Sequence, residues 1–159
     1  MSIIIYTDGS AKGNPGKGGY GVVMLSGKHR KEISEGFLLT TNNRMELLAV
    51  IVGLESVKTL KSDIVVYSDS KYVVNAVEKG WLFNWQKKNF KGKKNPDLWM
   101  RFLSVYKKHS VRFLWVKGHN NNTENERCDR LAVSAAEGTG LVSDIWYENQ
   151  NRNNSSSLF

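Results

Sequence analysis

Short apolar runs rich in β-branched residues recur along the chain, separated by breaks rich in glycine and asparagine. The first run, residues 3–8, is apolar at successive positions, which is typical of a central strand buried on both faces. Similar runs predict further strands at residues 20–25, 64–67 and 111–116. A hairpin turn at Ser26-Gly27-Lys28 predicts another strand over residues 31–38. The many glycines in residues 9–21 indicate turns leading into the second strand, because no phosphate-cradling nucleotide motif is present.

Longer segments between these runs predict helices. Residues 45–57 form a largely apolar helical segment, preceded by capping side chains in Thr41-Asn42-Asn43. Further helices are predicted after Asp69-Ser70, over residues 98–108, and over residues 123–137, where Thr123 opens a capping box and Gly138 ends the helix. Three strands joined by short turns should be antiparallel, whereas helical crossovers add parallel strands. The pattern therefore predicts an α/β layered fold.

Length and composition fit one globular domain of 159 residues. No apolar stretch approaches the roughly 18 residues that cross a bilayer, and the N-terminus lacks the features of a signal peptide. The single cysteine, Cys128, excludes an internal disulfide and a cysteine-based zinc site, and it suits a reducing compartment. We therefore expect a cytoplasmic protein that has no membrane partner.

The formal net charge of +8 indicates an anionic partner such as nucleic acid, although basic proteins without one are common. No acidic residue occurs between residues 79 and 95. This window interleaves aromatic residues with six lysines: Trp81, Phe83, Trp85 and Phe90 with Lys79, Lys87, Lys88, Lys91, Lys93 and Lys94. Lysines neutralise phosphates and aromatic rings stack on bases, so we favour nucleic-acid contact. The alternative is a solvated basic loop, with Trp81 and Trp85 on the buried face of a short helix.

Four acidic residues lie where acids are not expected. Asp8 and Asp69 each end an apolar strand, and ligands bind at the carboxyl ends of parallel strands in open α/β sheets. Glu46 is the one charged residue in the apolar part of its helix, and Asp129 lies early in the last helix. Each could instead cap a helix, occupy a turn or pair with a nearby cation. For all four to be accidental, every one of these alternatives must hold at once.

If these acids converge, they must take up protons or bind cations, because two charges about 4 Å apart repel by roughly 4 kcal/mol at an effective dielectric of 20. All-oxygen ligation suits Mg²⁺ or Mn²⁺, and a pair of such ions can activate water for phosphodiester hydrolysis. His119, in a polar loop before the last helix, could carry protons to or from a leaving group, although an exposed loop histidine is the commoner case.

The sequence resembles a known family, the bacterial type 1 ribonucleases H. The matching motifs occur in the family's order and span residues 3 to about 137. They are Tyr6-Thr7-Asp8-Gly9-Ser10, Gly13-Asn14-Pro15-Gly16, Thr41-Asn42-Asn43-Arg44-Met45-Glu46-Leu47, Tyr67-Ser68-Asp69-Ser70, Gly80-Trp81, Asn84-Trp85, Asp97-Leu98-Trp99, Trp115-Val116-Lys117-Gly118-His119 and Glu124-Asn125-Glu126-Arg127-Cys128-Asp129.

The resemblance implies a ribonuclease H-like fold: a five-stranded mixed sheet of order 3-2-1-4-5 flanked by helices. It implies sequence-nonspecific, two-metal hydrolysis of the RNA strand of RNA–DNA hybrids, leaving 5′-phosphate and 3′-hydroxyl ends. The family's catalytic and metal-binding carboxylates fall on Asp8, Glu46, Asp69 and Asp129, and its catalytic histidine falls on His119. Expected substrate contacts are Asn14, Thr41, Asn42, Asn43, Lys71, Trp81, Trp85, Lys87, Lys88 and Lys91. Mg²⁺ is the expected cofactor, with Mn²⁺ as a substitute.

We expect a catalytic domain over residues 1–138, with a basic protrusion at residues 81–96 and a C-terminal extension over residues 139–159. The protrusion is shorter than in well-known members, and Lys71 stands where the family often has glutamine. The extension matches nothing known to us in the family, and its Asn- and Ser-rich end has the composition of a disordered segment, although Trp146 and its neighbours could pack on the body.

Three rival functions remain. A strand transferase on a related fold usually needs additional DNA-binding domains, for which this chain is too short. A catalytically weak nucleic-acid-binding module on the same fold normally lacks one of the carboxylates, whereas all four are present here. A membrane-surface protein lacks its basic amphipathic helix. We therefore expect a monomeric hybrid nuclease.

Overall fold

The computed structural model describes residues 2–118 and 122–156. Its centre is a five-stranded sheet in the order β3-β2-β1-β4-β5, which confirms the predicted order. β1, β2 and β3 are antiparallel neighbours, whereas β4 runs parallel to both β1 and β5. The strands are β1 (Ser2–Lys12), β2 (Gly16–Ser26), β3 (His29–Thr40), β4 (Asp63–Ser68) and β5 (Ser110–Trp115).

The register between the parallel strands β1 and β4 determines which side chains lie next to each other beyond the end of β4. Ile5 of β1 pairs with Val66 of β4, and Tyr6 pairs with Tyr67, whose ring stacks on that of Tyr6 with centroids 4.7 Å apart. Asp8 follows Tyr6 by two residues, just as Asp69 follows Tyr67. The expectation that Asp8 ends its strand was wrong, because β1 continues to Lys12 and Asp8 pairs with Gly21 of β2. Asp69 does follow the end of β4, so the two aspartates lie close together at the carboxyl end of β4, where α/β folds hold their ligands.

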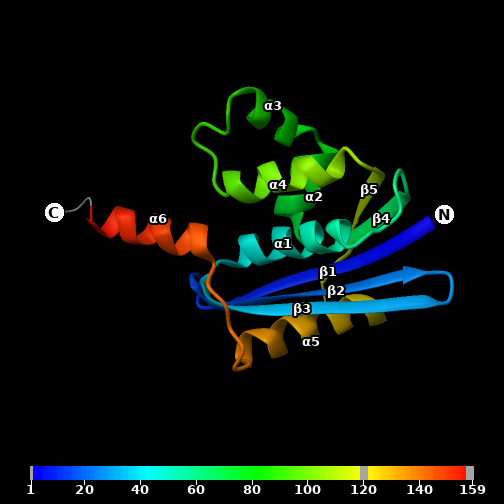
Figure 1. Cartoon of the computed structure of the whole chain (residues 1–159), viewed down its shortest axis with the longest axis horizontal. Coiled ribbons are helices and arrows are strands. Elements are labelled where there is room, and N and C mark those ends of the chain that lie inside the picture. The colour runs from blue at the N-terminus through cyan, green and yellow to red at the C-terminus, as the bar shows by residue number, and fades with distance from the viewer. Residues whose placement is uncertain (1, 119–121, 157–159) are drawn as a thin grey trace.

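Helices cover the two faces of the sheet unequally, as Figure 1 shows. Four helices lie on one face: α1 (Asn42–Glu55), α2 (Lys71–Glu78), α3 (Trp81–Lys87) and α4 (Pro96–Tyr106). α5 (Thr123–Glu137) packs alone on the other face, against β1, β2 and β3. α1 is apolar nearly all round because it lies between the sheet and α4.

Several glycines expected in turns lie instead inside β2, and this interpretation was wrong for them. A Cβ atom on Gly21 would lie 2.3 Å from the carbonyl oxygen of Cys128 in α5. The side-chain-free position therefore allows the helix backbone to approach the sheet closely. Gly13, with φ of 71°, is a true turn glycine between β1 and β2.

Helix starts follow local capping chemistry. α1 begins three residues earlier than predicted, because Thr41 is its N-cap and accepts a hydrogen bond from the Arg44 N–H. Ser70 caps α2 in the same way. The predicted cap of α5 was wrong by one residue: the side chain of Asn122, not of Thr123, caps this helix by accepting from the Asn125 N–H.

The basic segment, residues 81–96, is part helix and part loop. Its first half forms α3, which buries Leu82 fully and packs Trp85 edge-on against the core residue Trp99, with ring centroids 5.9 Å apart. Trp81 stays 46% exposed, so Trp81 and Trp85 do not share one buried face. Some of the aromatics therefore belong to the core and others are exposed, and contact with nucleic acid stays a prediction.

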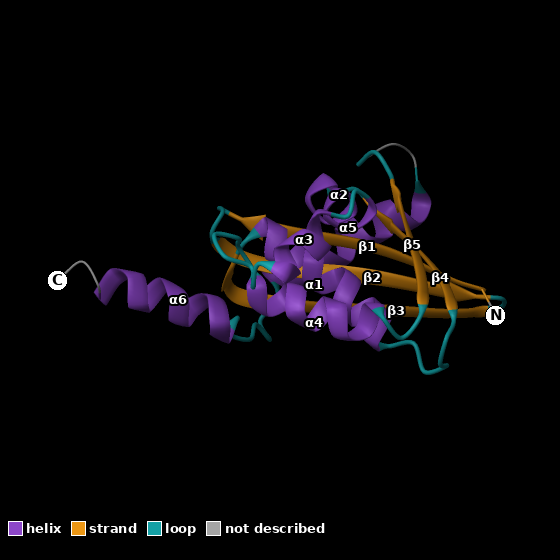
Figure 2. Ribbon diagram, turned by 90° about the horizontal axis from the view of Figure 1, so that it is seen from above, coloured by secondary structure: helices purple, strands orange, loops and turns teal. Residues whose placement is uncertain are grey.

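The C-terminal extension carries regular structure. Its first part pairs with the edge strand β3, where the Leu38 N–H donates to Val142 O at 2.8 Å and the Val142 N–H donates to Gly36 O at 3.0 Å. A helix, α6 (Ile145–Ser156), then extends beyond the body of the molecule (Figures 1 and 2). The expected disorder was therefore wrong for this stretch, and residues 157–159 lie outside the described residues.

No helix in the described part of the chain is both long and apolar enough to span a membrane.

Candidate active site

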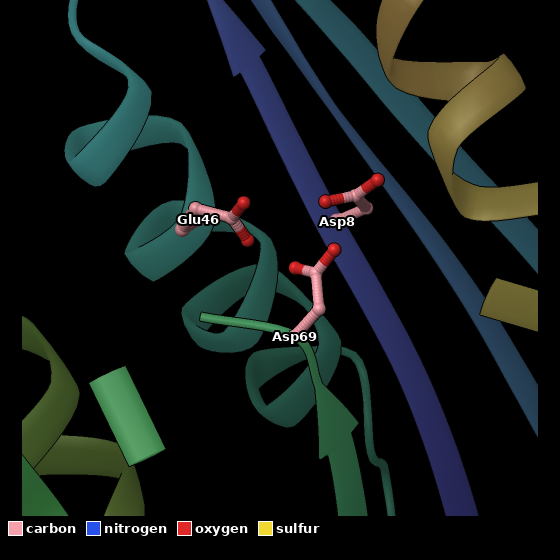
Figure 3. Close-up of side chains that lie close together, drawn as sticks. All are labelled: Asp8, Glu46 and Asp69. Carbon is pink, nitrogen blue, oxygen red and sulfur yellow. The ribbon is translucent and has the colours of Figure 1, made fainter. Parts of the chain in front are cut away.

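Three of the four predicted carboxylates converge at the carboxyl end of β4, beside the middle of β1. Asp8 comes from β1, Glu46 from α1 and Asp69 from the residue after β4. Each offers one carboxylate oxygen, and these oxygens all lie within 4.8 Å of one another. Figure 3 shows the three side chains pointing toward a common centre. Residues far apart in sequence thus form one acidic cluster, which we call the carboxylate cluster.

A close contact between β1 and α1 sets the position of Glu46 relative to Asp8. A Cβ atom on Gly9 would lie 2.3 Å from the backbone nitrogen of Glu46, so glycine lets the start of α1 pack directly on the strand. The Gly9 N–H also donates to Asp8 Oδ1 at 2.9 Å, which orients the aspartate. The motif residue after Asp8 therefore shapes the site through its missing side chain and its backbone donor.

Asp69 is positioned by residues from the end of β5 and the loop beyond it. The indole Nε1 of Trp115 donates to the backbone carbonyl of Asp69 at 3.0 Å. A Cβ atom on Gly118 would lie 2.9 Å from Asp69 Oδ2, so the loop backbone also comes close to this carboxylate. Lys71, in the first turn of α2, places its Nζ 4.9 Å from the centroid of the Trp115 ring.

The electrostatics show that the cluster is short of positive charge. Burial raises the pKa of Asp8 to about 8, with Asp69 and then Asp129 adding repulsion. Burial and repulsion from Asp8 and Asp69 likewise raise the pKa of Glu46 well above its usual range. Among the described residues, no hydrogen-bond partner reaches the buried Oε2 of Glu46. Such a cluster is stabilised by protons or by a bound cation.

The fourth carboxylate stands apart from this group. Asp129 lies on α5 and is close enough to raise the pKa of Asp8, but it is not among the three carboxylates that converge within 4.8 Å. It is partly exposed, unlike Asp8 and Glu46. His119 lies outside the described residues.

The predicted polar substrate contacts gather beside the start of α1. Asn14, in the turn between β1 and β2, accepts a hydrogen bond from the Asn42 N–H at 3.0 Å. Asn42 and Asn43 are exposed in the first turn of α1, directly after the cap Thr41. Two segments distant in sequence therefore present amide groups at one place, a single turn of helix before Glu46.

The predicted basic contacts lie on α2, α3 and the following loop. Lys87, Lys88 and Lys91 are exposed, as expected of a surface that meets phosphates. Lysines lie over two of the tryptophans: Lys79 Nζ is 5.3 Å from the ring centroid of Trp81, and Lys93 Nζ is 5.3 Å from that of Trp85.

One charged network near the site was not predicted. The guanidinium of Arg44, on the first turn of α1, donates to Asp144 at 2.7 and 2.9 Å and to Asp97 at 2.9 and 2.7 Å. Its Nη1 also donates to Asn95 Oδ1 at 3.2 Å. We call Arg44, Asn95, Asp97 and Asp144 the arginine network. An arginine within an apolar helix was the available signal, but its partners lie too far along the chain to infer.

Comparison with known proteins agrees with this geometry. The family model described as RNase H matches residues 1–137. Proteins named Ribonuclease H from Rippkaea orientalis and Desulforamulus reducens are 54% and 56% identical to this chain, and the matches cover 93% and 90% of it and 93% and 92% of those proteins.

Solved structures give the same result. LC9-RNase H1, described as a type 1 RNase H with the type 2 active-site motif, superposes with a TM-score of 0.78 at 30% identity, over 92% of this chain and 79% of that one. LC11-RNase H1, solved in complex with an RNA/DNA hybrid, superposes with a TM-score of 0.65 at 28% identity, over 85% of this chain and 96% of that one. The carboxylate cluster and these matches together place the chain in the RNase H family.

Proposed function

We propose that this protein is an endonuclease that hydrolyses the RNA strand of RNA–DNA hybrids in the presence of Mg²⁺. The observation that carries the proposal is the carboxylate cluster: three acids within 4.8 Å, two of them buried with raised pKa values, in a chain of the RNase H family. A solved relative whose description includes an RNA/DNA hybrid supports this substrate.

The donor set fits divalent metal ions. All three converging ligands are carboxylates, and the buried Glu46 Oε2 has no hydrogen-bond partner in the described part of the chain. Hard oxygen ligands favour Mg²⁺, with Mn²⁺ as a substitute. Asp8, Glu46 and Asp69 would hold one ion, and Asp8 with Asp129 a second. Two such ions would supply an activated water and charge stabilisation at the leaving oxygen of a phosphodiester.

The protein's own residues would supply orientation and proton transfer. Gly9 holds Asp8 in place, while Trp115 and Gly118 fix Asp69. His119 follows Gly118 directly in sequence, and the family resemblance assigns it the proton-transfer role. A histidine there can exchange a proton with the departing 3′-oxygen, so that the products carry 5′-phosphate and 3′-hydroxyl ends.

Recognition would depend on hybrid shape rather than on base sequence. An A-form-like helix exposes its 2′-hydroxyls in a wide, shallow minor groove, where the amides of Asn14, Asn42 and Asn43 can test for them beside Thr41. The DNA strand would lie on Lys71 and on the lysines and tryptophans of the basic protrusion. These contacts address phosphates and ring faces, which every sequence offers.

The remaining expectations belong to the same proposal. The catalytic unit would be residues 1–138, acting as a monomer. We place it in the cytoplasm, in keeping with a single cysteine, Cys128, that is buried and reduced.

The test is cleavage of an end-labelled RNA–DNA hybrid with Mg²⁺ or with EDTA, beside duplex DNA, duplex RNA and single-stranded RNA. We expect Mg²⁺-dependent cutting of the RNA strand in the hybrid alone. Hybrid binding without cleavage in Mg²⁺ or Mn²⁺ would instead favour the alternative function, a catalytically weak nucleic-acid-binding module.

A further inference from the structure

A polar groove of about 600 Å³ separates the C-terminal helix α6 from the rest of the molecule. One wall contains Asn14, Thr41 and Asn43, which the proposed function assigns to the substrate, and another comes from the segment that leads into α4. The far wall is α6. The groove is lined by Asn14, Pro15, Thr41, Asn43, Lys93, Lys94, Asn95, Pro96, Trp146, Tyr147, Gln150 and Asn151. Because the family model ends at residue 137, α6 lies wholly beyond it.

The base of α6 is held firmly against the body. Asp144, the residue before the helix, accepts two hydrogen bonds from the buried guanidinium of Arg44 and a third from the Thr40 hydroxyl at 2.7 Å. The rings of Trp146 and Tyr147 lie 5.0 and 5.8 Å from the same guanidinium carbon. The arginine network therefore fixes α6 relative to the start of α1, so the groove has a defined wall.

The chemistry of the groove matches a phosphodiester backbone. Of the described residues that line it, none is acidic, while Lys93 and Lys94 are exposed cations. Gln150 and Asn151 on α6 add carboxamides, each with two N–H donors. The carboxamide oxygen of Asn14 accepts a hydrogen bond from the Asn42 N–H, so the side-chain N–H groups of Asn14 can donate to a ligand. Amide and lysine donors are the groups that bind phosphate oxygens at nucleic-acid interfaces.

We propose that α6 extends the hybrid-binding surface: a strand of the duplex runs through this groove, with its phosphates between Lys93 and Lys94 on one side and Gln150 and Asn151 on the other. This inference rests on the proposed function for the identity of the duplex. It assigns to the extension a role in substrate affinity. The carboxylate cluster lies outside the lining of the groove, so α6 acts on binding and leaves the chemical step unchanged.

The test places negative charge in the groove. The double variant Gln150→Glu/Asn151→Asp adds two carboxylates to the α6 wall. The matched control, Asn149→Asp/Asn153→Asp, adds the same charge to the same helix at positions outside the groove lining. Hybrid Kd is measured by fluorescence anisotropy in EDTA, where no cleavage takes place, and kcat is measured at saturating hybrid with Mg²⁺.

We expect the groove variant to raise the hybrid Kd roughly tenfold at low salt and the control to change it by less than about twofold. The difference should shrink as salt rises, because exposed charges are screened. At saturating hybrid, kcat should equal that of the wild type. Equal Kd values for the groove variant and the control would overturn the inference. Wild-type protein that binds the hybrid but never cuts it would contradict the proposed function alone, since the Kd comparison still tests α6.

Discussion

Arg44 and Glu46 lie two residues apart in the first turns of α1, and they are equally hidden from solvent, at 2% and 5% exposure. Arg44 faces two aspartates and Asn95, and hydrogen bonds match its charge from every side. Glu46 faces Asp8 and Asp69, which carry charge of its own sign. The first turns of α1 thus carry one buried charge whose partners neutralise it and another whose neighbours repel it.

The pKa values show the same contrast. Burial lowers the pKa of the Arg44 guanidinium, but the hydrogen bonds that it donates to Asp97 and Asp144 outweigh burial and raise the pKa above its usual value. For Glu46, burial and its neighbours act together against the charged form. Buried charge that is fully paired stabilises a fold, whereas buried charge of one sign stores free energy that a bound cation can release. Both side chains are buried, so burial alone does not distinguish the functional group from the structural one. The sign of the neighbouring charges and the presence of hydrogen-bond partners do.

The largest expected effect comes from Glu46→Gln. This change keeps the size of the side chain but removes one ligand charge, so hybrid cleavage should fall by at least about 10⁴-fold, equivalent to roughly 5.5 kcal/mol in the activation free energy. The free energy of unfolding should stay the same or rise, because one repelling charge is gone. Cleavage rates and urea unfolding measure the two effects. Near-normal cleavage in this variant would remove Glu46 from the site.

Arg44→Ala should give the opposite result. It leaves Asp97 and Asp144 without their shared partner and detaches the base of α6, so we expect a loss of about 3–5 kcal/mol in the free energy of unfolding. Arg101→Ala is a matched control, because it breaks an exposed ion pair with Glu55 and should cost less than about 1 kcal/mol. Comparable losses in the two variants, measured by urea unfolding, would contradict the contrast between a buried and an exposed arginine.

The pH dependence of stability should be specific to the cluster. The folded-state pKa of Asp8 is raised from 3.8 to about 8, so the metal-free native state binds a proton that the unfolded chain has lost. Stability in EDTA should therefore be full below about pH 4 and decline by several kcal/mol, about 1.4 kcal/mol for each pH unit, as the pH rises from about 4 to about 8. Thermal unfolding across this range measures the effect.

Two controls make that measurement specific. Mg²⁺ should restore stability at high pH, because the cation replaces the lost proton. Asp8→Asn should reduce the slope in EDTA, because Asp8 no longer titrates while the buried Glu46 still does. A slope that is unchanged in Asp8→Asn would assign the pH dependence to another group.

The smallest expected effect concerns how the cluster is held. Trp115→Phe removes the indole donor to the Asp69 carbonyl, and one neutral hydrogen bond contributes about 0.5–1.5 kcal/mol. We expect kcat to fall by roughly two- to tenfold while KM for the hybrid stays near normal, because the tryptophan positions a ligand. Trp81→Phe, in the proposed binding surface, should raise KM and spare kcat. The same change in both parameters for both variants would remove this distinction.

The order of strands and the identity of the acids followed from local patterns. Runs of β-branched residues marked most strands, and a hairpin turn marked β3. Asp8 and Asp69 stood out because a charge after an apolar run needs an explanation. Glu46 stood out for the same reason in its helix. Capping chemistry predicted the start of α2 at Ser70, but it missed the start of α5 by one residue because Asn122 and Thr123 are both good caps.

The extension marks where such patterns fail. Its Asn- and Ser-rich composition suggested a disordered end, yet α6 forms on a base fixed by Asp144. Asp144 is an ordinary acid in the sequence, and its partner Arg44 lies 100 positions earlier. Composition measures how much apolar surface a segment can bury by itself, so it misses a segment that is held by contacts with a distant part of the chain.

The sequence by itself determined the strands, the helices α1, α2, α4 and α5, and the identity of the four carboxylates, because strand and helix patterns and acids in apolar surroundings are local properties of the chain. Only the tertiary structure decided that Asp8, Glu46 and Asp69 meet while Asp129 stands apart, that Arg44 is neutralised two residues from an unneutralised Glu46, and that α6 closes a groove beside the substrate residues. Distances between residues remote in sequence, and the burial that sets their pKa values, exist only once the chain has folded.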